Sequence, residues 1–93
     1  MPYINEERRQ YWNRQLTQLE ENVTDTDAGD VNYIITKILI AWVKNKLRYI
    51  KICMVIGTLF CVALEFYRRV AAPYEDKKIK ENGDVYDDLL EKG

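Results

Sequence analysis

Apolar residues are most concentrated between Ile50 and Phe66, where they occupy every side of the expected helix instead of one stripe. A helix that is apolar all round has to be buried all round, in a protein core or in lipid. Because a chain of 93 residues has few other residues to wrap around it, we expect copies of the same chain to cover its second face. One side of the helical wheel carries Ile50, Cys53, Met54, Gly57, Phe60, Cys61 and Leu64, and the opposite side carries Ile52, Val55, Ile56, Leu59, Val62, Ala63 and Phe66.

The segment before this helix has the pattern of two further helices joined by a polar loop. Asn5 is a favourable N-cap for the first, which is amphipathic because its apolar residues form one narrow stripe. The polar run 24–29 predicts a loop, after which Asp30 caps a second helix with a broad apolar face that runs to about Lys46. The apolar stripe of the first helix consists of Trp12, Leu16, Leu19 and Val23.

Pro73 predicts that the chain bends after the central helix. Proline kinks a helix interior, and Ala72 before it is biased away from helical geometry. We therefore expect an all-α protein with a single domain, 1–93, that has three main helices plus short C-terminal helices and forms a homo-oligomeric helical bundle. The predicted helices cover about 5–23, 31–46, 49–72, 74–81 and 84–91.

The charge balance and the residue types exclude several kinds of site. Fourteen Lys and Arg residues against fifteen Asp and Glu give a net charge of -1, so a nucleic acid polymer is not an expected partner. The chain has no His, which removes the most frequent general base and metal ligand, and its two cysteines form no zinc motif. We expect no cofactor and no bound metal.

Cys53 and Cys61 lie two helical turns apart, about 12 Å along one helix, which is too far for a disulfide between them. We expect buried thiols in a reducing cytoplasm, and an interchain disulfide is the alternative.

The N-terminus has no apolar run typical of a signal peptide. A membrane span is not expected, because the uncharged run between Lys51 and Glu65 is shorter than the about 20 residues that a span needs. A hairpin that dips into a membrane stays as an alternative.

A ligand-binding surface is predicted where basic and aromatic residues alternate between Leu64 and Tyr86. Arg68 and Arg69 would hold phosphates, and Lys77 and Lys78 would add positive charge. Tyr67 or Tyr74 would stack on a base of the ligand, while Glu65 and Asn32 would orient the polar edges of the ligand. The alternative is that the charges pair along a solvated helix, as Glu65 with Arg69 and Asp76 with Lys80 at i, i+4 spacing.

The sequence supports an enzymatic function less well than it supports ligand binding. All-α nucleotide pyrophosphatases of the MazG kind hold magnesium with Glu-x-x-Glu and Glu-x-x-Asp pairs on facing helices. Here Arg68 follows Glu65 at the third position and Lys78 follows Glu75, so neither pair is present. A magnesium-dependent all-α nucleotide pyrophosphohydrolase is therefore the third hypothesis, and we expect no enzyme activity.

Three segments resemble a family of short uncharacterised proteins encoded by tailed bacteriophages. They are GDVNYIITK from Gly29 to Lys37, IGTL from Ile56 to Leu59, and LEFYRRVAAPYEDKKIKENGDVY from Leu64 to Tyr86. The resemblance implies a phage accessory protein that acts in the host bacterial cytoplasm, and it implies no established activity. The chain departs from the family pattern between Cys53 and Ala63, which is more apolar here, so a polar site on that part of the helix is not expected.

A fainter resemblance links the segment from Leu64 to Ala72 to small helical phage anti-CBASS proteins, which oligomerise and sequester cyclic oligonucleotide signals. It implies a non-enzymatic anti-defence protein that binds a nucleotide-derived immune signal. The alternative is a protein-interaction module that inhibits a host enzyme or defence protein through the apolar surface of its first two helices.

Overall fold

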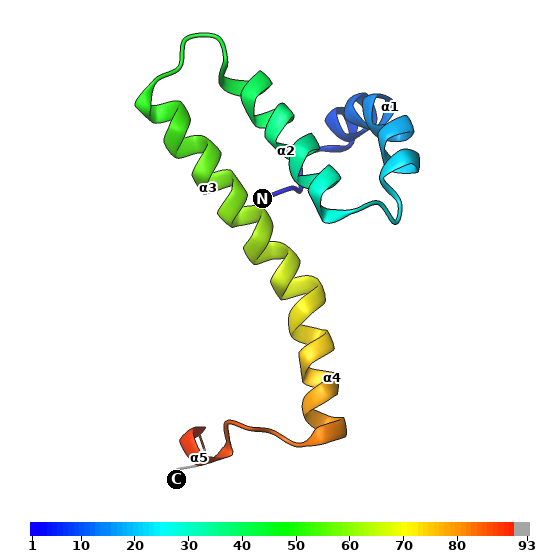
Figure 1. Cartoon of the computed structure of the whole chain (residues 1–93), viewed down its shortest axis with the longest axis vertical. Coiled ribbons are helices and arrows are strands. Elements are labelled where there is room, and N and C mark those ends of the chain that lie inside the picture. The colour runs from blue at the N-terminus through cyan, green and yellow to red at the C-terminus, as the bar shows by residue number, and fades with distance from the viewer. Residues whose placement is uncertain (91–93) are drawn as a thin grey trace. The chain divides into compact units, whose positions relative to one another are not determined.

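The computed structural model describes residues 1–90, which are helical apart from short connections and contain no strand (Figure 1). The prediction of an all-α protein is confirmed. The elements are α1 (Glu6–Val23), α2 (Ala28–Val43), α3 (Tyr49–Phe66), the π-helical turn η1 (Tyr67–Ala71), α4 (Ala72–Asn82) and α5 (Asp87–Leu90). The sequence predicts a single domain, whereas backbone contacts divide the chain into two units, Met1–Thr58 and Leu59–Gly93.

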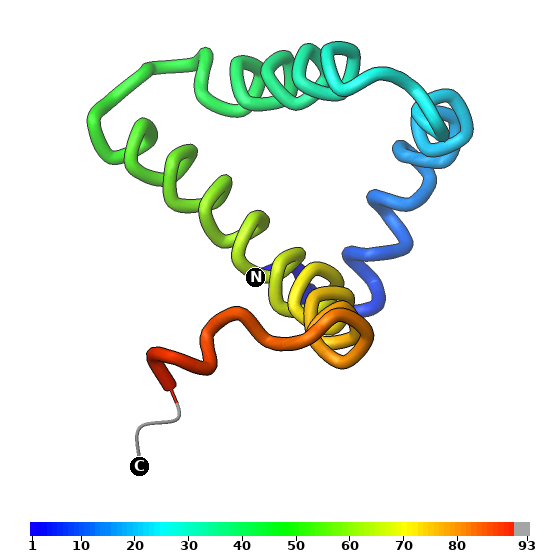
Figure 2. Tube along the Cα trace, turned by 60° about the horizontal axis from the view of Figure 1, so that its bottom comes forward, coloured from blue at the N-terminus to red at the C-terminus, as the bar shows by residue number. Residues whose placement is uncertain are grey.

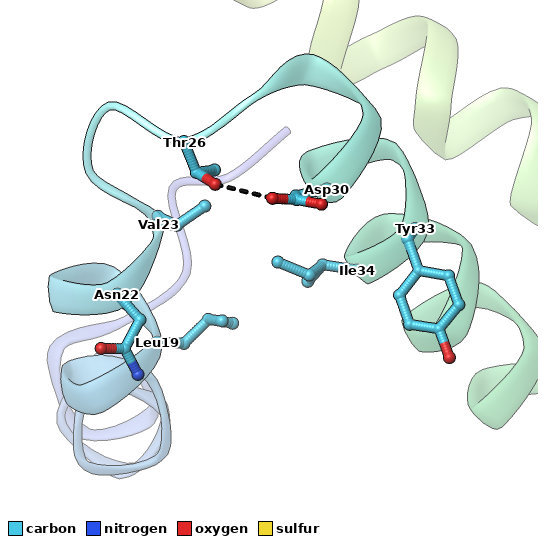
Figure 3. A pocket seen from close by; sticks show the side chains of 7 residues that line it. All are labelled: Leu19, Asn22, Val23, Thr26, Asp30, Tyr33 and Ile34. Atoms are coloured by element: carbon cyan, nitrogen blue, oxygen red, sulfur yellow. Dashed lines mark hydrogen bonds between the residues drawn. The ribbon is translucent and has the colours of Figure 1, made fainter.

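The first unit contains α1, α2 and the beginning of α3, which follow one another through the connections 24–27 and 44–48 (Figure 2). Within the described residues, no two of these helices pack along their whole length. At the corner between α1 and α2, the side chains of Leu19, Val23 and Ile34 point toward one another (Figure 3). The Thr26 hydroxyl donates a hydrogen bond of 2.9 Å to the Asp30 carboxylate beside them, which ties the loop to α2.

The helix α2 faces α3 across two apolar hollows and does not pack closely against it. One hollow, of about 190 Å³, is lined by Leu39, Ile40, Val43, Leu47, Ile52, Val55 and Ile56. The α3 residues in this set all belong to one of the two apolar sides of its helical wheel, whereas Ile50 and Met54 of the other side line the second hollow with Trp42 and Val43. Cys53, Gly57, Phe60, Cys61 and Leu64 line neither hollow, and we call them the uncovered face of the long helix.

The N-terminus of α1 is capped by Asn5, as predicted. Its side-chain Oδ1 accepts the backbone N–H of Arg8 at 2.9 Å, and Glu6 and Glu7 occupy the first turn, where the helix dipole favours carboxylates. We expect Asn5→Ala to lower the free energy of unfolding by about 1 kcal/mol, because one N–H loses its acceptor. Thermal melts followed by far-UV circular dichroism measure this. Asn5→Asp keeps an acceptor and serves as the control; equal melting of both variants would contradict the cap's contribution.

Two helix boundaries differ from the sequence prediction in the first unit. The helix expected over 31–46 is α2, Ala28–Val43, and its N-cap is Asp27, so Asp30 lies in the first turn and not at the cap. The helix ends early because Lys46 adopts a left-handed conformation with φ of 64°, which a continuing α-helix does not allow. Asp25, with φ of 61°, forms the corresponding turn in the loop after α1.

The largest difference from the sequence prediction concerns Pro73, after which a separate helix over 74–81 was expected, although the sequence left open a continuous helix that Pro73 kinks. The structure instead has one continuous helix from Tyr49 to Asn82, 34 residues long. The wider π turn η1 lies directly before the proline, and the Ala72 N–H donates to the Tyr67 carbonyl five residues back. In a regular helix, the proline ring clashes with the carbonyl four residues earlier. The wider turn relieves this clash, so the helix continues.

At the C-terminus, the helix expected over 84–91 is α5, which covers only Asp87–Leu90. The Asp84 carboxylate accepts the backbone N–H of Tyr86 at 2.9 Å, and this local turn keeps residues 84–86 out of the helix. Residue 91 lies outside the described residues.

No residue among 1–90 is fully buried. Cys53 and Cys61, which were expected to be buried, are exposed. By length and composition, the helix from Tyr49 to Asn82 is also long and apolar enough to cross a membrane. The shorter uncharged run used in the sequence prediction does not by itself exclude a span, because the helix continues past Lys51 and Glu65.

Candidate ligand-binding site

A hollow of about 480 Å³ lies in the second unit, beside the C-terminal half of α4. Its walls come from η1, from one side of α4 and from the segment that leaves α4 toward α5, which Figure 1 shows turning away from the end of the helix. We call it the C-terminal hollow. It is lined by Tyr67, Glu75, Lys78, Ile79, Asn82, Gly83, Asp84, Val85 and Tyr86.

The π turn brings Tyr67 and Glu75 to the same side of the helix. In a regular α-helix, residues eight positions apart point about 80° away from each other. One extra residue in a π turn makes them equivalent to residues seven positions apart, which differ by only about 20°. The Tyr67 hydroxyl accordingly donates a hydrogen bond of 2.8 Å to Glu75 Oε1.

The Glu75 carboxylate also raises the pKa of Tyr67, first through this hydrogen bond and then through its negative charge. An ionised Tyr67 would lose the hydrogen bond and repel Glu75. The contribution of this contact to stability is therefore fully present below the ordinary tyrosine pKa of about 10, and is lost as the pH rises through the raised pKa of Tyr67. At neutral pH the hydroxyl stays a donor.

The far wall of the hollow is formed by a chain reversal after α4. Gly83 has φ of 96°, a conformation that favours glycine, and its N–H donates to the Ile79 carbonyl at 2.8 Å. The turn at Asp84 then places Tyr86 along the hollow. The sequence predicts that this helix ends at about residue 81, and α4 ends one residue later, at Asn82.

Some of the basic residues in the predicted binding surface already form ion pairs with carboxylates of the same chain, and others do not. Arg68 forms a two-pronged ion pair with Glu65, with Nη2 to Oε2 at 2.7 Å and Nε to Oε1 at 3.3 Å. Lys78 pairs with Glu81 at 3.2 Å and lies 5.7 Å from the centre of the Tyr74 ring.

Arg69 and Lys77 are the predicted phosphate ligands that form no hydrogen bond or ion pair within residues 1–90. The expected i, i+4 pairs of Glu65 with Arg69 and of Asp76 with Lys80 do not form in this part of the chain; the observed pairs have i, i+3 spacing. Two cations therefore remain available to an anion.

The predicted site is only partly assembled. Tyr67 and Lys78 line the C-terminal hollow, whereas Tyr74 lies beneath Lys78 and does not line it. The carboxylate of Glu65 is already bound in the ion pair with Arg68. Asn32 belongs to α2 in the first unit, where its Oδ1 accepts the Thr36 hydroxyl at 3.3 Å.

Sequence reasoning missed four polar or aromatic residues of the hollow. Glu75 and Asn82 were not predicted because helical periodicity alone does not place them beside Tyr67. Asp84 and Tyr86 were seen only as parts of a helix and a basic-aromatic cluster. A π turn has no established sequence signature, although a proline directly after an Arg-rich turn could have suggested one. Within residues 1–90, no group of three His, Cys, Asp or Glu side chains is placed to hold a metal ion.

The comparison with protein families gives one match, a domain of unknown function, DUF6899, over residues 1–85. The chain belongs to the DUF6899 family. No curated protein and no solved structure matches it. The matched region of this DUF6899 protein contains the first unit, the second unit up to Val85, and every residue of the C-terminal hollow except Tyr86.

Proposed function

We propose that this DUF6899 protein is a non-enzymatic bacteriophage accessory protein that binds and sequesters a nucleotide-derived immune signal in the host cytoplasm. The observation that carries the proposal is the C-terminal hollow, where two tyrosines and a lysine line a space of about 480 Å³. Aromatic rings stack on bases, and Arg and Lys bind phosphate. The hollow therefore combines the chemistry that both halves of a nucleotide require.

We reassign the phosphate and base contacts relative to those predicted from the sequence. Arg69 and Lys77 are the better phosphate ligands, because Arg68 would first have to leave Glu65. Tyr67 and Tyr86 line the hollow and supply the aromatic walls, in preference to Tyr74, which contacts Lys78. Lys78 lies at the rim and adds positive charge.

Homo-oligomerisation is part of the proposal, and the exposed surface supports it. The chain exposes 8685 Å², whereas a folded monomer of 11.1 kDa exposes about 5,700 Å². The excess of about 3,000 Å² exceeds what each chain buries in a stable homodimer, about 1,000–2,500 Å². Contacts with further copies of the chain would remove this surface from water.

The uncovered face of the long helix is the surface on which we place these contacts. Cys53, Gly57 and Cys61 recur every four residues, and small side chains let helix backbones approach closely. Gly57 has no atom within 4 Å of the position where a Cβ would lie, so no other part of the chain crosses the helix there. Phe60 and Leu64 flank this row and are 65% and 67% exposed.

Calorimetry with a panel of cyclic and ADP-ribose-derived nucleotides tests ligand binding. We expect Arg69→Ala combined with Lys77→Ala to weaken binding about a hundredfold, because two charge-assisted hydrogen bonds of about 1.5 kcal/mol each are lost. The control is Lys37→Ala combined with Lys80→Ala, which removes the same charge away from the hollow. Absence of binding by the wild-type protein, or an equal loss in both double variants, would refute the proposal.

A second candidate function is inhibition of a host enzyme through the first unit. The aromatic residues Tyr11, Trp12 and Tyr33 are exposed on α1 and α2, which favours a protein partner. A pull-down from host lysate followed by Trp12→Ala distinguishes this function, since a signal-binding protein needs no protein partner. The magnesium-dependent pyrophosphohydrolase is tested in the same samples, where nucleoside triphosphates should survive incubation with Mg²⁺ or Mn²⁺.

A further inference from the structure

Glu75 is the one carboxylate of the C-terminal hollow that a neighbouring side chain holds in place without neutralising it. A carboxylate has about four lone-pair positions and accepts hydrogen bonds only. One position receives the Tyr67 hydroxyl at 2.8 Å, and within residues 1–90 Glu75 forms no other hydrogen bond and no ion pair. The remaining positions are available to a donor on a ligand.

Tyr67 is a positioning residue for this carboxylate. Its hydroxyl fixes Oε1, and since the pKa of Tyr67 is raised, the hydroxyl remains a donor throughout the physiological range. The opposite arrangement, in which Glu75 is held by a cation, would neutralise it. Asn82 lies two turns further along the same face of α4, and Tyr86 lines the hollow as well. A planar ring that stacks on Tyr67 or Tyr86 would therefore meet an acceptor-only group at its edge.

Nucleobases differ in what their edges offer to such an acceptor. Adenine, cytosine and guanine carry exocyclic amino groups, which donate hydrogen bonds, and a glutamate or aspartate accepts from the cytosine amino group in known complexes. A base without an amino group leaves the negative carboxylate without a donor. Since an unpaired polar group weakens binding, the carboxylate discriminates between these bases.

We infer that Glu75, held by Tyr67, selects nucleobases with an exocyclic amino group. This inference rests on the proposed function, because it names the part of the ligand that the C-terminal hollow recognises. Lys78 does not cancel the selection, because its ammonium group is paired with Glu81.

The test compares adenosine 5′-monophosphate with purine riboside 5′-monophosphate, which lacks only the 6-amino group, by NMR titration of the full-length protein. We expect the adenosine compound to bind about tenfold more tightly, as one hydrogen bond to a charged acceptor predicts. Glu75→Gln, whose amide can donate as well as accept, should reduce this ratio to about one. Asp76→Asn removes the same charge from the same helix outside the hollow, and it should leave the ratio unchanged.

The outcomes separate this inference from the proposed function. If neither compound nor any nucleotide of the calorimetry panel binds, the proposed function fails, and the inference fails with it. If panel nucleotides bind but the two monophosphates bind equally, or if adenosine 5′-monophosphate does not bind, only the inference is overturned. The inference is also overturned if Glu75→Gln keeps the wild-type ratio. Tyr67→Phe should lower the ratio partly, because the carboxylate loses its fixed orientation.

Discussion

Replacing both Phe60 and Leu64 by lysine is expected to convert the oligomer into monomers. The two side chains are 65% and 67% exposed in the single chain and lie on the uncovered face of the long helix. Burying one such side chain contributes about 1.5–3 kcal/mol, so losing both should raise the dissociation constant at least a hundredfold. Native mass spectrometry and sedimentation measure the change, and mild oxidation should cross-link wild-type chains through Cys53 or Cys61 but not the monomeric variant.

The control for this experiment is Leu89→Lys, which places the same charge at a position of α5 that is 69% exposed. We expect it to leave the subunit number unchanged, because Leu89 is not on the uncovered face. A wild-type chain that is already monomeric in dilute solution would contradict the oligomer. A chain that stays in solution only with detergent would also contradict it, and would assign the helix from Tyr49 to Asn82 to a membrane instead.

Inserting one alanine between Val70 and Ala71 is expected to abolish nucleotide binding while helix formation is preserved. The insertion adds one more residue between Tyr67 and Glu75, so that even with the π turn η1 they become equivalent to residues eight positions apart and point about 80° away from each other. The hydrogen bond between them and the side of the hollow that they form would both be lost. Since stacking on one aromatic ring contributes about 1–3 kcal/mol, affinity should fall more than tenfold. Calorimetry measures the affinity and circular dichroism the helix content.

Val70→Ala is the matched control, because it places an alanine in η1 and keeps the number of residues there. Binding by this variant should equal that of the wild type. Unchanged affinity after the insertion would mean that the ligand does not use Tyr67 and Glu75 together. A loss of helix content in the insertion variant would instead contradict the view that the long helix tolerates an extra residue at this turn.

The predictions from sequence succeeded where one local signal was sufficient. The cap at Asn5 and the end of α4 at Gly83 depend on neighbouring residues, and both were placed correctly. The extent of α1 follows from its single apolar stripe. The end of α2 was missed because it depends on the left-handed conformation of Lys46. Glycine, asparagine and aspartate adopt this conformation routinely, whereas lysine does not, so the residue type gave no signal.

The candidate site was predicted less completely than the helices. The sequence predicts a binding surface between Leu64 and Tyr86, and of the predicted residues Tyr67 and Lys78 line the C-terminal hollow. The predicted residues Arg68 and Glu65 bind each other instead, because three residues of separation bring their side chains together on a helix surface. Glu75 was discussed only for a missing metal motif, although it holds the most specific contact of the site.

Sequence alone determined that this protein is helical, because 3.6-residue periodicity and helix caps are properties of neighbouring residues. It also identified the apolar central helix as having too few partners within its own chain. Only the tertiary structure decided that residues from both apolar sides of that helix border hollows shared with α2. It also decided that the helix passes Pro73 and that Tyr67 meets Glu75. The physical reason is that periodicity assumes a constant rotation per residue, and one π turn changes that rotation for every residue that follows.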